Sequence, residues 1–294
     1  MLRVMMTMMA GGAMAAPAER VIAPDGIAAA TVQQTKVTLR IDPAAPSIPL
    51  LTSVAATRAG LKGGFFGLNF LVGRDRVHGR SAVGGIDLGT GAIKRRIGWA
   101  DRGYAAAVDG VVGPGGLPEP VVRFQLNASR AGERIVTLPM LDQGGLGAHW
   151  GVLYARIEVE GEPMRVSFDP HHRRTLATAG AAVRIAAAQG GQLSGAATPV
   201  EIAFGIERPV RRMTLARPLA LGPLALSDIG VRTSDFGDAR TIPEADADPD
   251  EIVVTGRKKR DTSRDRLTIG ADDLARCSSI VFDKPRHTIS LSCG

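Results

Sequence analysis

One pattern of residues occurs twice in this chain, and the repetition constrains the fold more than any other feature. A segment with β-like alternation ends in Asp42-Pro43 in the first copy and in Asp169-Pro170 in the second. A helical patch follows each Asp-Pro, at 50–61 and at 176–188, and a pair of glycines ends each patch. We interpret the copies as an internal duplication, which predicts two similar lobes of about 110 residues each.

The composition favours short strands joined by turns. The chain contains 36 Gly and 18 Pro, and aromatic residues make up only 4% of it. With 45% hydrophobic and 22% charged residues it can build a sizeable core, which excludes a largely disordered chain. Residues 152–159 and 164–168 alternate on either side of a turn and predict a β-hairpin. The expected fold class is therefore mainly β, in two lobes, with short helices.

The net charge of +7 does not by itself indicate a nucleic-acid partner. Binding of nucleic acid favours clustered basic residues interleaved with aromatic ones, and the chain contains no such stretch, so we expect no nucleic-acid partner. Residues 144–147 (GGLG) lack the spacing and context of a nucleotide-binding loop and are interpreted as a linker between the lobes. No cofactor is expected.

The amino terminus has the features of an export signal. Arg3 precedes an apolar stretch at 4–14, and Ala13-Met14-Ala15 fits the small residues of a cleavage site. We therefore expect a signal peptide at 1–15 and a periplasmic or secreted mature chain; a cytosolic terminus without a signal is the alternative. No later apolar run is long enough to cross a bilayer, so no transmembrane segment is expected after signal removal.

The two cysteines of the chain, Cys277 and Cys293, both lie near its carboxyl end. In the oxidising compartment that an exported protein meets, we expect them to form a disulfide. A bond that closes a loop of this size stabilises a fold by about 3 kcal/mol. A metal site is not expected, because His287 alone cannot complete four ligands with them.

A strand that ends in Asp at the same place in both copies predicts that Asp42 and Asp169 face each other between the lobes. Two facing carboxyl groups share one proton, because both cannot ionise at close range. One of them then acts as a base on water while the other acts as an acid. The pair is therefore a candidate catalytic dyad.

The region 31–238 resembles the bacterial retropepsin-like and pepsin-like aspartic proteases in this arrangement. The resemblance implies a two-lobed aspartic-protease-like β-barrel fold, a cleft between the lobes and the pair Asp42 and Asp169 as its catalytic carboxylates. The family also packs a later segment of two hydrophobic residues and Gly behind each Asp. The run 109–113 (DGVVG) is similar to that segment in lobe one, and its counterpart in lobe two is either 220–222 (ALG) or 228–230 (DIG).

The motif that follows each Asp departs from the family. Pro replaces the usual Thr in both lobes, and Ala44 and His171 replace the usual Gly. Proline has neither a hydroxyl nor an N–H, so the reciprocal hydrogen bonds that the family's threonines make across the seam are lost. A displacement of about 1 Å can cost about 100-fold in rate, so we expect little or no conventional proteolysis. The residues expected to shape the cleft around the pair are Pro43, Pro170, His171, Asp109, Gly110 and Gly113.

Three interpretations of the pair stay open. In the first, the cleft binds an extended peptide or protein ligand by strand addition without cutting it. In the second, Asp42 and Asp169 still activate water as an aspartic endopeptidase, assisted by His171 or His172. In the third, each Asp-Pro only ends a strand and begins a turn.

The repeated pattern divides the chain into 16–147 for lobe one and 148–240 for lobe two, and the composition changes after Asp238. An acidic linker is expected at 241–256, and a basic, disulfide-closed tail at 257–294. Within the linker, one run resembles the TonB box of outer-membrane receptors and predicts pairing with an edge strand of TonB: Glu251, Ile252, Val253, Val254 and Thr255. An ordinary docking strand within this protein is the alternative.

Overall fold

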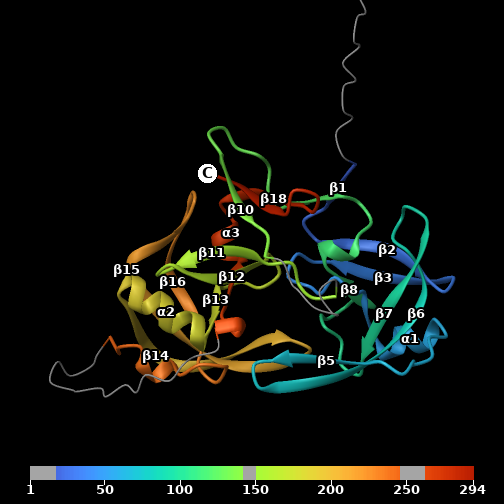
Figure 1. The fold of residues 1–294 in the computed structure, drawn as a ribbon, viewed down its shortest axis with the longest axis horizontal. Coiled ribbons are helices and arrows are strands. Elements are labelled where there is room, and N and C mark those ends of the chain that lie inside the picture. The colour runs from blue at the N-terminus through green and yellow to red at the C-terminus, as the bar shows by residue number, and fades with distance from the viewer. Residues whose placement is uncertain (1–17, 142–149, 246–261) are drawn as a thin grey trace, which may run out of the picture.

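The structure, a computed structural model, describes residues 18–141, 150–245 and 262–294. Its strands form two sheets of seven strands and one of five (Figure 1). One seven-stranded sheet lies on the right of Figure 1 and the other on the left, with the five-stranded sheet above them. Buried side chains of all three sheets, among them Leu39, Phe168 and Phe282, belong to one hydrophobic core. The prediction of a mainly β, two-lobed fold with short helices is confirmed.

Lobe one is built on the first seven-stranded sheet, whose strands lie in the order β2-β3-β8-β4-β7-β6-β5. It also contains the helix α1 (Ser53–Arg58) and the 3-10 turn η1 (Pro114–Gly116). The strands are β2 (Ile27–Val32), β3 (Thr35–Ile41), β4 (Leu50–Thr52), β5 (Gly67–Val72), β6 (Asp75–Asp87), β7 (Ala92–Ala100) and β8 (Gly110–Val112).

Lobe two repeats this plan, with strands in the order β11-β12-β17-β13-β16-β15-β14. The strands are β11 (Ala155–Val159), β12 (Glu162–Asp169), β13 (Leu176–Thr178), β14 (Gly191–Ala203), β15 (Ile206–Leu221), β16 (Leu224–Arg232) and β17 (Arg266–Gly270). Its helical segments are α2 (Ala179–Gln189), η2 (Ala239–Thr241), η3 (Thr262–Arg264) and α3 (Ala271–Leu274). Each position in one sheet order has a counterpart in the other, as the repeated sequence pattern predicts.

The helices α1 and α2 begin at equivalent threonine caps. The hydroxyl oxygen of Thr52 accepts the N–H of Ala55 at 3.1 Å, and that of Thr178 accepts the N–H of Ala181 at 3.4 Å. The residues just before the helices form β4 and β13, so the predicted helical patches begin too early. These short strands are almost entirely buried, and a strand buried on both faces lacks the alternation that distinguishes it from a helix.

The chain beyond the acidic linker is not a separate tail. Arg266–Gly270 forms β17, which lies in the middle of the lobe-two sheet between β12 and β13. It therefore occupies the place that β8 holds in lobe one. Lobe two therefore does not end at residue 240 as expected, since its sheet includes β17. A shift in composition marks a linker, but it does not show that the chain after the linker rejoins the same sheet.

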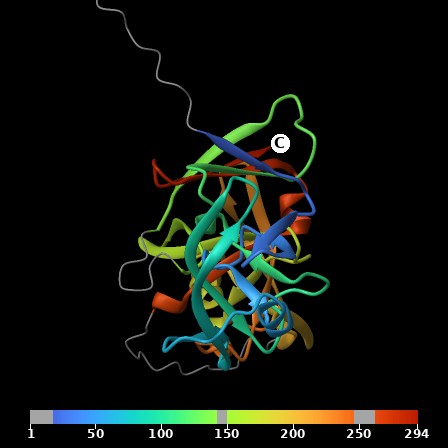
Figure 2. The same cartoon turned by 90° about the vertical axis from the view of Figure 1, so that its right-hand side faces the viewer.

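The five-stranded sheet has the order β1-β9-β18-β19-β10 and gathers the first and last described strands of the chain at one end of the molecule (Figures 1 and 2). Its strands are β1 (Glu19–Ile22), β9 (Val121–Gln125), β10 (Arg134–Pro139), β18 (Cys277–Asp283) and β19 (Thr288–Cys293). Because β9 and β10 follow lobe one in sequence while β18 and β19 follow β17, this sheet ties the two lobes together.

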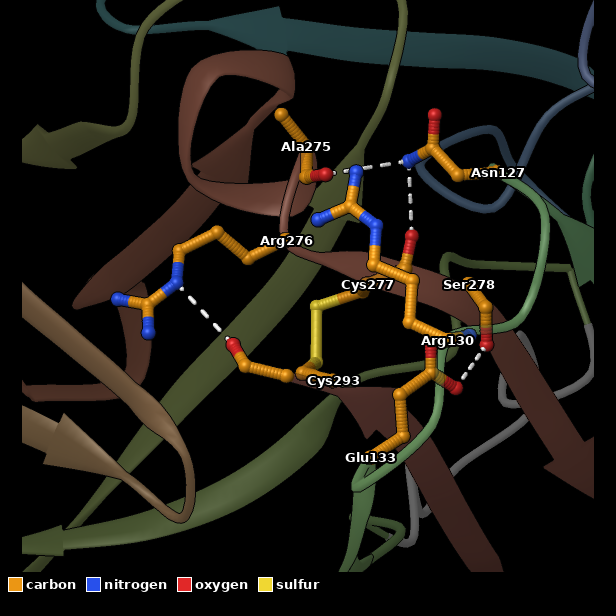
Figure 3. The surroundings of a disulfide bond; sticks show 9 residues. Asn127, Arg130, Glu133, Ala275, Arg276, Cys277, Ser278 and Cys293 are labelled. Atoms are coloured by element: carbon orange, nitrogen blue, oxygen red, sulfur yellow. Dashed lines mark hydrogen bonds between the residues drawn. A yellow bond between two sulfur atoms is a disulfide. The ribbon is translucent and has the colours of Figure 1, made fainter.

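The expected disulfide between Cys277 and Cys293 is present and joins neighbouring positions of β18 and β19 (Figure 3). Around it, the side-chain amide of Asn127 donates to the carbonyl oxygen of Cys277 at 2.8 Å. The hydroxyl of Ser278 donates to the carboxylate of Glu133 at 2.6 Å. The bond therefore fastens the carboxyl end of the chain within the five-stranded sheet, where segments that follow lobe one hold it on the other side.

Several sequence predictions lie outside the described residues. These are the signal peptide at 1–15, the glycine-rich run at 144–147, the TonB-box-like strand at 251–255 and the first residues, 257–261, of the expected basic tail. Within the described part of the chain, no helix is long and apolar enough to cross a membrane.

Candidate active site

Each Asp-Pro sequence lies in a loop that joins two strands flanking a third. In lobe one the loop runs from β3 to β4, and both pair with β8, β3 in parallel and β4 antiparallel. In lobe two the loop runs from the end of β12 to β13, and both pair in the same senses with β17. The main-chain N–H of Asp42 donates to the carbonyl oxygen of Val112 at 3.0 Å, which ties the start of the first loop to β8. The repeated topology thus presents the two aspartates from equivalent points.

Main-chain N–H groups hold both carboxyl groups despite the prolines. An oxygen of Asp42 accepts the N–H of Ala44 at 2.7 Å. An oxygen of Asp169 accepts the N–H of His171 at 3.0 Å and that of His172 at 3.1 Å. Proline removes the donor directly after each Asp, but the next residue supplies one in a short Asx-type turn. This main-chain support compensates in part for the threonine contacts that the prolines remove.

A glycine packs behind each loop at a distance that excludes any side chain. A Cβ added to Gly113 would lie 2.1 Å from the carbonyl oxygen of Ala45, and one added to Gly270 would lie 2.3 Å from the carbonyl carbon of Arg174. Gly270 is therefore the lobe-two counterpart of Gly113. The two alternatives predicted from sequence, 220–222 and 228–230, are both wrong, since they belong to β15 and its turn and to β16. The true counterpart lies beyond the linker, where the sequence analysis expected a tail.

Asp109 and Gly110 support the loop from behind and do not line the cavity around the pair. The carboxylate of Asp109 accepts the N–H of Thr38 at 2.9 Å and forms an ion pair with Arg58 at 2.9 Å. Gly110 allows close packing, because a Cβ there would lie 2.5 Å from the carbonyl oxygen of Leu50. These residues fasten β8 to the strands around it.

Asp42 and Asp169 line one cavity of about 440 Å³ between the lobes. Burial raises the pKa of Asp42 to about 8, and the charge of Asp169 adds to the rise. Asp42 is only 4% exposed, whereas Asp169 is partly exposed. The surroundings of Asp42 therefore favour its protonated form.

Tyr104 is a residue of the site that the sequence analysis missed. Its hydroxyl donates to the carbonyl oxygen of Ala44 at 3.2 Å, and its ring borders the same cavity as the two aspartates. Burial raises its pKa well above 10, and the charges of Asp42 and Asp169 add to this, so it stays a hydrogen-bond donor. The chain has only two tyrosines, and the other, Tyr154, borders a neighbouring cavity. That rarity was the one signal available in the sequence.

The two histidines after Asp169 are placed differently. His171 lines the cavity, and burial lowers its pKa, with Arg40 adding to the effect, so the neutral form of its ring is favoured. His172 also lines the cavity, but its two ring nitrogens lie 3.0 Å from the carbonyl oxygen of Arg174 and 3.2 Å from that of Glu201. Its ring is therefore engaged with the main chain, and His171 is the better placed of the two to assist the aspartates.

A long hairpin from each lobe reaches across the site to the other lobe. The β5–β6 hairpin of lobe one turns at Gly73-Arg74, and the β14–β15 hairpin of lobe two turns at Phe204-Gly205. Both hairpins line a second cavity of about 150 Å³ that also contains Asp169 and Tyr104. The rings of Phe70 and Phe204, one from each hairpin, lie 5.3 Å apart. The hairpins thus meet at the cavity that contains Asp169, and β5 and β14 run toward each other in Figure 1.

The sequence matches no known protein family and no curated protein. Among solved structures, it is similar to the crystal structure of an aspartic proteinase from Irpex lacteus, with a TM-score of 0.44. The two chains are 12% identical, and the match covers 92% of this chain and 94% of that chain. The chemistry proposed below depends on the geometry of this chain's own residues.

Proposed function

We propose that the protein binds an extended peptide in the cleft between its lobes and hydrolyses it slowly, with Asp42 and Asp169 as the acid–base pair. The observation that carries the proposal is the raised pKa of Asp42 beside Asp169 in a single cavity. A protonated carboxyl next to an ionised one supplies both halves of general acid–base catalysis at the same pH.

In the proposed reaction, the ionised carboxylate takes a proton from water as the water oxygen attacks the peptide carbonyl carbon. The protonated carboxyl of Asp42 donates to the carbonyl oxygen as that oxygen gains charge. The proton taken from water then passes from Asp169 to the peptide nitrogen, and a hydroxyl proton of the tetrahedral intermediate returns to Asp42. The C–N bond breaks, and the nitrogen departs as an amine. The N–H groups of Ala44, His171 and His172 hold the two carboxyl groups during these steps.

The rate is expected to be low because the prolines leave the seam between the lobes without the threonine contacts. Replacing Pro43 and Pro170 together by Thr should therefore raise the rate of hydrolysis, by up to about 100-fold if the carboxyl groups are at present misplaced by about 1 Å. A double variant that folds, binds peptide and cleaves no faster would show that the prolines do not limit the reaction.

The second candidate function is capture of an extended peptide without cleavage. The observation in its favour is that Pro43 and Pro170 offer no donor and no hydroxyl across the seam. Both functions need the same cleft, so they differ only in what becomes of the bound peptide.

A peptide library incubated with the purified protein and followed by mass spectrometry separates the two. We expect cleavage that falls as the pH rises past about 8, where Asp42 loses its proton. The variants Asp42→Asn and Asp169→Asn should lose this cleavage. The matched control is Asp228→Asn, which changes a partly exposed carboxylate paired with Arg212 on the surface of lobe two.

Binding of unmodified peptide without products over days would favour the second candidate. Absence of both binding and cleavage would contradict both functions. The expected disulfide and the absence of a membrane-spanning helix from the described residues fit an exported protein, and we propose the periplasm or the medium as its place of action.

A further inference from the structure

Next to the aspartates lies a third cavity, of about 230 Å³, whose lining is unusually basic. Four arginines line it, from β12, β16, η3 and β17: Arg165, Arg232, Arg264 and Arg266. It shares Leu71, Arg232 and Arg266 with the cavity that contains Asp169 and both hairpins. The two cavities are therefore neighbours, and a chain that lies against Asp169 passes close to the arginines.

Most of this positive charge has no carboxylate to balance it. Asp235 is the one acidic side chain that lines the cavity among the described residues. Its two oxygens are already engaged, one with Arg232 at 2.6 Å and the other with Arg208 at 3.3 Å. Of the four arginines, Arg232 is buried and has Asp235 as its partner, while Arg165 and Arg266 are half-buried and Arg264 is exposed. Four positive charges around one carboxylate attract an anion, and three of them are reachable from solvent.

The other three arginines are held by neutral partners. Arg266 donates to the hydroxyl of Tyr154 at 2.7 Å. The guanidinium of Arg165 lies 5.7 Å from the centre of the Tyr154 ring, and that of Arg264 lies 3.9 Å from the centre of the Phe236 ring. Ring contacts position a guanidinium without neutralising it, and they leave its N–H groups free to point elsewhere. The three arginines are thus positioned at the cavity without an ion-pair partner among the described residues.

We propose that this arginine cavity binds a carboxylate of the peptide held in the cleft, so that the protein selects substrates with an acidic residue beside the bond at the aspartates. This inference depends on the proposed function, since it names the substrate class of the same cleft. A carboxylate matches the fork of a guanidinium with two parallel hydrogen bonds. With a volume of about 230 Å³, the cavity has room for one side chain.

Matched peptides test the proposal by equilibrium binding, which does not require turnover. Each peptide carries Glu or its neutral isostere Gln at one position, in versions with a free and with an amidated carboxyl end. For one of the positions tested, we expect the wild-type protein to bind the peptide with Glu about ten-fold more tightly than the peptide with Gln. The free and amidated versions show whether the carboxylate is a side chain or the end of the chain.

The variants Arg165→Gln and Arg264→Gln should each reduce this preference to about three-fold or less, because each removes one donor fork without breaking an ion pair of Asp235. Arg212→Gln is the matched control, since Arg212 pairs with Asp228 on the outside of lobe two. It should keep the ten-fold preference.

Two outcomes overturn the proposal, and they are distinguishable. If the wild-type protein binds or cleaves peptides with no preference for Glu or a free end over their neutral forms, the arginine cavity is not a carboxylate site while the proposed function stands. If it binds no peptide of either kind, the proposed function fails and the substrate class fails with it.

Discussion

The two lobes share one frame but surround their aspartates differently. Asp42 is buried and accepts one main-chain N–H, whereas Asp169 is partly exposed and accepts two. A carboxyl group with less access to water and fewer donors holds its proton more firmly. The repeated topology therefore brings together two chemically identical residues in unequal surroundings, which is the condition for an acid and a base at one pH.

The hairpin tips differ in the same way. Gly73, at the tip from lobe one, packs on an ionic group of lobe two that contains Arg208 and Asp235. At the other tip, Phe204 packs on the rings of Phe70 and Tyr104 in lobe one. One tip is thus held by charge and the other by aromatic contact. The lobes kept the scaffold and diverged in the side chains that face the cleft.

The largest expected effect tests whether the surroundings of Asp42 and Asp169 differ as described. The pKa of Asp42 is about 8 in the folded protein against an ordinary value of 3.8. Between these values the folded protein keeps a proton that the unfolded chain releases, so the free energy of unfolding should fall as the pH rises from about 4 to about 8. Each unit of pKa difference corresponds to about 1.4 kcal/mol, so the total is several kcal/mol.

Denaturant titrations from pH 4 to pH 9 measure this slope. Asp42→Asn should remove most of it, because the amide is neutral in both states. Asp169→Asn should reduce it only in part, because burial, the larger cause of the raised pKa, remains. Equal effects of the two substitutions would contradict the inequality of the pair.

The second effect tests the equivalence of the two supporting glycines. Gly113→Ala and Gly270→Ala should each lower the free energy of unfolding by about 3 kcal/mol, since either Cβ would collide with main-chain atoms of an Asp loop. Gly85→Ala is the control, because its nearest atom to an added Cβ is a side-chain oxygen of Gln33 at 3.8 Å. A neutral Gly270→Ala would show that β17 does not hold the loop of lobe two as β8 holds that of lobe one.

These glycines also show what the sequence could and could not predict. The repeated Asp-Pro and the helical patches after it are local patterns, and they were enough to predict two lobes of the same plan, each with an Asp-Pro loop. Gly270 is separated from Asp169 by about a hundred residues and a linker, so no local pattern joins it to its loop. The N–H support of the carboxyl groups depends on loop geometry. Tyr104 reaches the site through a hydrogen bond to the carbonyl oxygen of Ala44, which lies 60 positions earlier in the chain.

The third effect concerns the aromatic tip. Phe204 is 3% exposed and has a left-handed backbone, with φ of 59°, which the two-residue turn of the hairpin requires. Phe204→Ala should weaken the attachment of the β14–β15 tip by about 2 kcal/mol. Phe204→Gly should weaken it less, because Gly adopts this φ without strain. The N–H of Phe204 donates to the carbonyl oxygen of Tyr104 at 3.2 Å. Its hydrogen exchange therefore reports how often the β14–β15 tip opens in the wild-type protein.

The smallest expected effect concerns the tip of the β5–β6 hairpin. It tests whether charge holds this tip while aromatic contacts hold the tip of the β14–β15 hairpin. Asp75, half exposed, pairs with Arg208 at 2.5 Å, while Arg208 keeps its buried contact with Asp235. Asp75→Asn should therefore weaken the β5–β6 tip by less than about 1 kcal/mol. Raising the salt concentration should speed hydrogen exchange at Gly73 and Arg74 in the wild-type protein but little in this variant, because the screened pair is already gone. Exchange at the Phe204 tip should respond little to salt in either protein, and an equal response at both tips would mean that charge does not distinguish the two hairpins.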